Sequence, residues 1–256
     1  MHFTDTHSHL YLPEFDQDRD EIIKRAIDQK VTKIFLPNID SESIYPMLQL
    51  ADKFPQNCFP MIGLHPTSVK RNFQQELEII EEWLGKRSFF GIGEVGIDLY
   101  WDKTFRKEQI LAFQHQIQLS LDHSLPLIIH SRNSFQEIFS SLENFSDKNL
   151  SGIFHSFTGT IEEAQKAIRM GFKIGINGIV SFKNSDLGKV VAEIGLDHLV
   201  LETDSPYLAP APKRGKRNES SFLIYIAEKI AEITRIDIKT VAAKTNQNAT
   251  EVFGIG

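Results

Sequence analysis

Cysteine and long apolar runs are the two things this sequence most clearly lacks. Its 256 residues include a single cysteine, Cys58, so no internal disulfide can form, and this favours a reducing compartment over secretion. No apolar run approaches the ~18–20 residues that a membrane-spanning helix needs. The first five residues, MHFTD, are polar and acidic, unlike a signal peptide. We therefore expect a cytoplasmic protein that does not enter the membrane.

The sequence also lacks an excess of positive charge. It has 28 Lys and Arg against 34 Asp and Glu, which gives a formal net charge of −6 at pH 7. Taken alone, this balance argues against a nucleic-acid partner, because proteins that coat nucleic acid are usually basic. Apolar residues are plentiful, at 41% of the chain, which is enough for a packed core and argues against intrinsic disorder.

Short apolar segments alternate with longer amphipathic ones along the whole chain. Strands are predicted at residues 3–6, 33–37, 59–64, 89–94, 126–130, 152–155, 172–176 and 199–203. Helices are predicted most clearly at 18–29, 74–85, 105–122, 161–170 and 220–233, and a long loop at 205–218. Eight alternating units in 256 residues favour an α/β fold, a (β/α)8 barrel in a single domain spanning 1–256. A doubly wound open sheet is the alternative, because periodicity does not establish closure.

Histidine or carboxylate side chains follow most of the predicted strands. They are His7, His9, Glu94, His130, His155 and Asp204. A buried strand has no structural need of such an ending, whereas catalytic groups gather at the C-terminal strand ends of a (β/α)8 barrel. Four histidines and two carboxylates converging there predict a site for one or two divalent ions. The donor set suits Zn²⁺, Mn²⁺, Ni²⁺ or Co²⁺, while Mg²⁺ would prefer more oxygen.

The motifs around these residues resemble those of the TatD family of metal-dependent deoxyribonucleases, which are amidohydrolase-like (β/α)8 barrels. The motifs are HSH at 7–9, GLHP at 63–66, GEVGID at 93–98, HSR at 130–132, HSFTG at 155–159 and ETDSPYL at 202–208. The likeness continues through RGKRNE at 214–219 to Asn246 and Phe253. Asn133, Ser156 and Ser220 depart from the residues common in the family, which bears on loop shape and substrate fit and leaves every ligand position intact.

The resemblance implies a two-metal site built from the six residues named above. His7, His9 and Asp204 would hold one ion. His130 and His155 would hold the second, and Glu94 would bridge the two. Mg²⁺, Mn²⁺ and Zn²⁺ are the candidate ions, and such ions can lower the pKa of a water to about 7 and stabilise an in-line displacement. Asp204 and Glu94 are the candidate catalytic carboxylates, with Asp204 as the general base.

Further residues are candidates for holding a phosphate or supporting the ligands. His65 would donate a hydrogen bond or, alternatively, cap the turn that follows it. Arg132 offers a planar fork that suits a phosphate, or forms a structural salt bridge. Glu202 would orient a ligand histidine or a water. Four more cations lie in one loop and either contact nucleic acid or form a solvated face: Lys213, Arg214, Lys216 and Arg217.

The function implied by the resemblance is hydrolysis of DNA, as a 3′–5′ exonuclease that acts on single strands. Tyr100, Trp101 and Tyr207 would either stack unpaired bases or pack the loops. We expect a monomer. One alternative is a hydrolase of a non-nucleic ester or amide bond that uses the same ions. Another is a nucleic-acid-binding or scaffolding barrel with a vestigial site, against which the complete ligand set argues.

Overall fold

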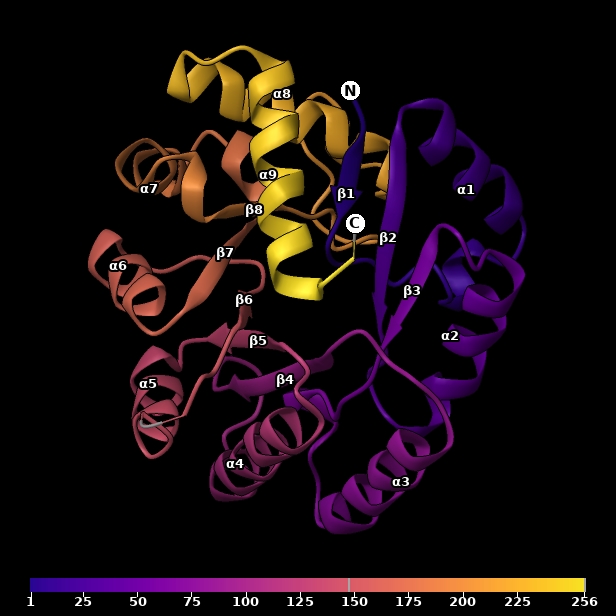
Figure 1. Cartoon of the computed structure of the whole chain (residues 1–256), viewed down its shortest axis with the longest axis vertical. Coiled ribbons are helices and arrows are strands. Elements are labelled where there is room, and N and C mark those ends of the chain that lie inside the picture. Colours follow the sequence, from indigo (N-terminus) through magenta and orange to yellow (C-terminus); the bar gives the residue numbers. More distant parts are fainter. Residues whose placement is uncertain (147, 256) are drawn as a thin grey trace.

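A computed structural model describes residues 1–146 and 148–255, and within these residues the chain forms eight strands and nine α-helices. The strands are β1 (Phe3–Asp5), β2 (Val31–Pro37), β3 (Cys58–Met61), β4 (Ile92–Asp98), β5 (Leu127–Arg132), β6 (Gly152–Phe154), β7 (Phe172–Ile176) and β8 (Leu199–Leu201). They lie in chain order and pair in parallel, as β1-β2-β3 and as β4 to β8. The helices surround them (Figure 1).

Two further bridges join the two sheets into a closed barrel. Ile62, just after β3, pairs in parallel with Ile92 of β4, and Ser8, after β1, pairs in parallel with Ser205, after β8. In a doubly wound sheet the strand order would reverse at a switch point, and here it does not. The prediction of a (β/α)8 barrel is confirmed, and the open sheet is excluded.

Each predicted helix is present, close to its predicted bounds. These are α1 (Arg19–Asp28), α3 (Phe73–Lys86), α4 (Arg106–His123), α6 (Ile161–Arg169) and α8 (Leu223–Thr234). The sequence did not single out α2 (Ser41–Lys53), α5 (Phe135–Glu143), α7 (Leu187–Ile194) or α9 (Ile238–Phe253). None of the helices in the described part of the chain has the length and apolar character of a membrane span.

One predicted strand is displaced. The prediction for 89–94 is wrong at both ends, since β4 begins at Ile92 and runs to Asp98. All seven of its residues are buried. Two of them are glycines and two are carboxylates, so the strand lacks the continuous apolar run by which a buried strand is predicted. The extension matters for function, because it places Glu94 inside the barrel and Asp98 at its rim.

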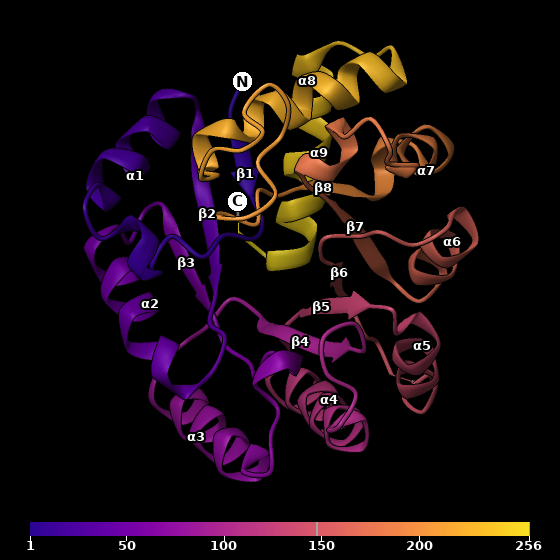
Figure 2. The ribbon, with the colours of Figure 1, turned by 180° about the vertical axis from the view of Figure 1, so that it is seen from behind.

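The last helix, α9, covers the end of the barrel at which the strands begin. The Asn248 amide donates hydrogen bonds to the carbonyl oxygens of Leu196 and Leu199, beside the start of β8, at 2.7 Å each. The ring of Phe253 stacks on Phe35 of β2, with the two centroids 3.6 Å apart. Figure 1 shows α9 across this end, and Figure 2 shows the opposite end from behind. The carboxyl ends of the strands therefore form the accessible end.

Candidate metal centre

Glu94 lies at the centre of the predicted ligand cluster and is 3% exposed. Its Oε2 is 3.1 Å from Nε2 of His7 and 3.7 Å from Nε2 of His9. Its Oε1 is 2.8 Å from Nδ1 of His130 and 3.7 Å from Nε2 of His155. The two oxygens of one carboxylate thus face two separate pairs of imidazoles, which is the geometry that a carboxylate bridging two cations requires.

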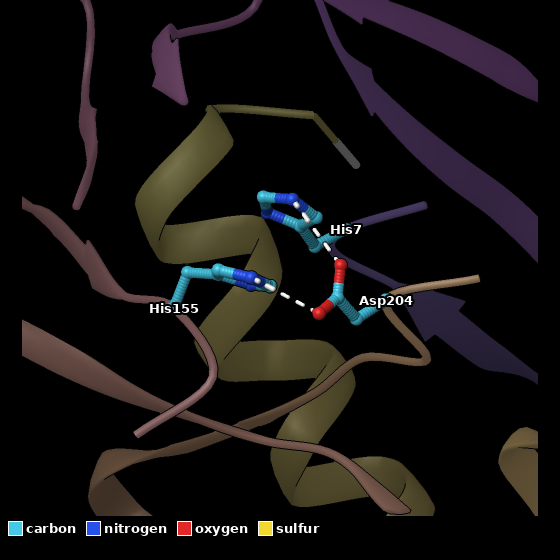
Figure 3. A group of neighbouring side chains, drawn as sticks. All are labelled: His7, His155 and Asp204. Carbon is cyan, nitrogen blue, oxygen red and sulfur yellow. Dashed lines mark ion pairs between the residues drawn. The ribbon is translucent and has the colours of Figure 1, made fainter. Parts of the chain in front are cut away.

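Asp204 completes the cluster from the end of β8. Its Oδ1 lies 3.6 Å from Nε2 of His9. The same Oδ1 lies 4.0 Å from Nε2 of His7, and Oδ2 lies 3.7 Å from Nε2 of His155 (Figure 3). Its backbone has a positive φ of 58° and its N–H donates to the carbonyl oxygen of His7 at 2.9 Å. Aspartate tolerates this conformation better than most residues. The structure therefore brings all six predicted ligands together.

The donor set fits divalent cations. The Nε2 atoms of His7 and His9 are 3.2 Å apart, and the rings of His7 and His155 stack with centroids 3.3 Å apart. Burial, together with the neighbouring His155, lowers the pKa of His7 to about 3, so this imidazole is neutral at pH 7 and its lone pair is available. Imidazole nitrogens and carboxylate oxygens that face one another in a buried space are the donor set that divalent cations such as Zn²⁺ and Mn²⁺ accept. Three overlapping groups of side chains can hold an ion: His7, His155 and Asp204; His7, His9 and Glu94; and His65, Glu94 and His130.

His65 lies closer to the cluster than the sequence suggested. Its Nε2 is 3.4 Å from Oε1 of Glu94, and its ring packs edge-on against His130 with centroids 4.8 Å apart. Its Nδ1 also accepts a hydrogen bond from the backbone N–H of Thr67 at 3.2 Å. The alternative expectation, that His65 caps the following turn, is confirmed, and its role in holding a phosphate stays a prediction.

Asp98 holds His130 from behind, and sequence reasoning missed this role. Its Oδ2 accepts a hydrogen bond from Nε2 of His130 at 2.9 Å. Burial alone would lower the pKa of His130, but the hydrogen bonds to Asp98 and Glu94 outweigh it and raise that pKa to about 9. The available signal was the spacing of Asp98, four residues after Glu94, which places both side chains on one side of a strand.

Glu202 lies behind His155 at ion-pair distance, without the hydrogen bond that Asp98 makes to His130. Its Oε2 lies 3.1 Å from Nδ1 of His155, and its Oε1 accepts a hydrogen bond from the backbone N–H of Ser156 at 2.5 Å. The carboxylate fits only because β7 has a glycine beside it, since a Cβ on Gly175 would lie 2.4 Å from Oε2. Carboxylates behind ligand histidines fix the tautomer and direct the other nitrogen at the ion.

A pocket of about 530 Å³ lies over these residues. Its walls include Trp101, Arg132 and Tyr207, together with Glu94 and Asp204. A wider groove of about 910 Å³ runs between α1 and α2, but none of the six predicted ligands lines it. The chemistry therefore belongs to the smaller pocket.

The basic loop at 213–217 does not line this pocket, and Lys213, Arg214 and Arg217 contact other parts of the protein. Arg217 donates a hydrogen bond to the Asp18 carboxylate at 2.7 Å. The Arg214 guanidinium lies 3.8 Å from the centre of the Phe182 ring. A role for Lys213, Arg214, Lys216 and Arg217 in substrate binding stays a prediction.

A (β/α)8 barrel with histidines and carboxylates gathered at its carboxyl end is the architecture of a metal-dependent hydrolase. Residues 4–254 match the family model "TatD related DNase", and the chain belongs to this family. It is 36% identical over 252 residues to the metal-dependent hydrolase YabD of Bacillus subtilis, with 98% of each chain covered. It is 29% identical over 248 residues to the 3′-5′ ssDNA/RNA exonuclease TatD of Erwinia tasmaniensis, covering 94% of this chain and 96% of that one.

The solved structures lead to the same family. The crystal structure of YjjV, a TatD homolog from Escherichia coli, superposes with a TM-score of 0.93 at 26% identity, covering 99% of this chain and 98% of that one. The chain is thus a metal-dependent hydrolase of the TatD family.

Proposed function

We propose that this hydrolase cleaves DNA phosphodiester bonds with the help of two divalent ions, as a 3′–5′ exonuclease on single strands. The observation that carries the proposal is the position of Glu94, whose two oxygens face separate sets of imidazoles beneath an open pocket. The name of the Erwinia relative, a 3′-5′ ssDNA/RNA exonuclease, supports the same substrate class.

The ligands divide into two sets around Glu94. His7, His9 and Asp204 would hold one ion. His130 and His155, which face the other oxygen of Glu94, would hold the second ion. When bound, Mg²⁺, Mn²⁺ or Zn²⁺ would attract the phosphate, ionise a water near neutral pH and stabilise the charge of the displacement.

The protein's own groups supply the proton acceptor and position the phosphate. Burial tends to raise the pKa of Asp204, but its interactions with His155, His7 and His9 outweigh burial and lower that pKa below the ordinary value. Asp204 is therefore ionised at pH 7 and can accept the proton of the attacking water. Arg132, in the wall of the same pocket, offers a planar pair of N–H groups to the phosphate oxygens.

Metal removal and a single variant test this proposal together. Protein stripped by a chelator should leave a 5′-labelled single-stranded oligonucleotide intact, and Mg²⁺, Mn²⁺ or Zn²⁺ should restore a ladder of fragments shortened from the 3′ end. Asp204→Asn should lower the rate at least about 100-fold, the usual worth of a general base. Asp186→Asn is the control and should keep full activity, because Asp186 is exposed and pairs with Lys189 on the surface.

Folded, metal-loaded protein that leaves DNA and RNA uncut would contradict the proposal. If such protein instead hydrolysed an aryl ester or an amide, the metal centre would stand and the nucleic-acid substrate would be wrong.

A further inference from the structure

We propose that Trp101, Tyr100 and Arg132 form a subsite that holds one unpaired nucleobase and its neighbouring phosphate at the mouth of the pocket. Trp101 and Arg132 both line the pocket that contains Glu94, and Tyr100 lies beside them. This inference rests on the proposed nuclease function and specifies how the substrate is recognised.

The two aromatic rings are too exposed to serve only as loop packing. Trp101 is 70% exposed and Tyr100 is 52% exposed. The rings meet edge to face, with centroids 4.9 Å apart and planes at 88°. An exposed indole beside a catalytic pocket offers a flat apolar face, and base stacking on such faces is the general means by which proteins bind unpaired strands.

Arg132 adds a charge that the protein itself leaves available. Its guanidinium carbon lies 3.9 Å from the Tyr100 ring centre and 5.2 Å from that of Trp101. Its side chain contacts these two rings; among residues 1–146 and 148–255, no carboxylate forms an ion pair with the guanidinium and no group accepts a hydrogen bond from it. The rings of Tyr100 and Trp101 make cation–π contacts with the flat face of the Arg132 guanidinium. Its N–H groups are left for a phosphate that follows the stacked base.

Asp98 ties this subsite to the metal centre. One oxygen of Asp98 accepts hydrogen bonds from the backbone N–H groups of Tyr100, at 2.9 Å, and Trp101, at 3.4 Å. The other oxygen accepts the hydrogen bond from His130. A single carboxylate therefore sets the spacing between the stacked base and the ligands. A base inside a duplex has no free face to offer, so this subsite selects single strands.

Fluorescence tests the contact directly, because the chain has only two tryptophans. The other, Trp83, lies on α3 against Tyr45 and does not line the pocket. In Trp83→Phe, the metal-loaded protein should show saturable quenching of Trp101 by a phosphorothioate oligothymidylate. An abasic oligomer of the same length and a blunt duplex should quench little. Saturable binding of the oligothymidylate, followed by anisotropy, without quenching would overturn the subsite.

Kinetics separate the base from the backbone. Trp101→Ala should lower kcat/KM on a base-bearing single strand about tenfold, mainly through KM. The loss on an abasic strand should be much smaller, because Tyr100 still stacks on Arg132. Trp101→Phe should recover most of the loss. Tyr45→Ala is the matched control, because Tyr45 is an aromatic residue 65% exposed on α2, outside the pocket.

The outcomes distinguish the subsite from the nuclease proposal. Cleavage of DNA that Trp101→Ala does not impair, or an equal loss on abasic strands, would overturn the subsite and leave the nuclease in place. Base-dependent quenching by a protein that cleaves no nucleic acid would overturn the nuclease and leave the subsite.

Discussion

Two of the predicted ligand histidines, His130 and His155, each have a carboxylate behind them that sets the orientation of the ring. An imidazole presents a single nitrogen to an ion, and the partner of its other nitrogen decides which one that is. Asp98 accepts a hydrogen bond from Nε2 of His130, so Nδ1 of that ring faces Glu94. Glu202 lies beside Nδ1 of His155, so Nε2 faces Glu94 and Asp204. The two histidines thus use opposite nitrogens, for reasons that lie outside the ligand set.

Asp98→Asn is the most informative change at this scale. The amide oxygen can still accept from the loop N–H groups of Tyr100 and Trp101, while the amide nitrogen cannot accept from His130. We expect metal affinity to fall about 10- to 100-fold, which is typical for the loss of such a partner. Titration of metal-stripped protein by calorimetry measures this without reference to activity.

Asp197→Asn is the control for that titration, because Asp197 is exposed and pairs with Lys244 far from the pocket. If Asp98→Asn bound metal as tightly as the unaltered protein, the orienting role of Asp98 would be wrong.

At the scale of elements, the long connection between β8 and α8 is fixed to α1. Arg25 of α1 donates hydrogen bonds to both oxygens of Glu219, at 3.0 and 2.7 Å. Arg217 bonds Asp18 at the start of the same helix. The loop that follows Asp204 is therefore anchored to α1 at two points, which restrains the motion of one wall of the pocket.

Glu219 should make stability depend on pH in the acid range. Burial tends to raise its pKa, but the bonds from Arg25 and Ser221 outweigh burial, and the folded pKa lies below the ordinary 4.5. Its contribution is therefore fully present above pH 4.5 and is lost as pH falls through the folded pKa. Glu219→Gln should lower the free energy of unfolding by about 1 kcal/mol at pH 7, a modest figure because Arg25 is partly exposed to solvent.

Urea unfolding at pH 7 and pH 3.5, both in chelator, measures this difference. The gap between Glu219→Gln and the unaltered protein should narrow at pH 3.5. Glu232→Gln, whose carboxylate pairs with Lys229 on the exposed surface of α8, should differ little from the unaltered protein at either pH. A gap that stayed constant between the two pH values would refute the role of Glu219.

At the scale of the whole molecule, stability and chemistry occupy opposite ends of the barrel. Phe253 of α9 belongs to one apolar cluster with residues of the barrel strands: Phe35, Met61, Ile128, Ile153 and Val200. Phe253→Ala should lower the free energy of unfolding by about 3 kcal/mol, the low end for a buried phenylalanine. The activity per folded molecule should stay unchanged, because the ligands lie at the other end.

Leu111→Ala, at a position 56% exposed on α4, is the matched control and should cost less than about 0.5 kcal/mol. A large loss of metal affinity in folded Phe253→Ala would show that the two ends are not independent.

The sequence predicted much of this fold, and two of the helices that it did not single out, α9 and α2, have physical explanations. Helix α9 buries Thr245 and Asn248 along with its apolar residues, so its inner face has no clear apolar period. Helix α2 contains Pro46, which usually ends a helix, yet a capping box at Asp40 and Ser43 stabilises its start. Burial against the barrel therefore explains α9, and the capping box explains how α2 forms despite its proline.

The sequence by itself indicated the barrel and singled out the six candidate ligands. In a closed parallel barrel all strands end at the same rim, so a residue type that recurs at strand ends is brought together by the topology alone. That is why His7 and Asp204, nearly two hundred residues apart, could be assigned to one site. The net charge of −6 did not exclude a phosphate substrate, because it describes the whole surface and not this rim.

Only the tertiary structure decided which further side chains serve the site. Arg217 turns to Asp18, while Arg132 stacks on exposed rings above the metal centre. Asp98 joins that stack to His130. Such contacts depend on how separate loops pack against one another, and the spacing of residues along the chain does not predict that packing.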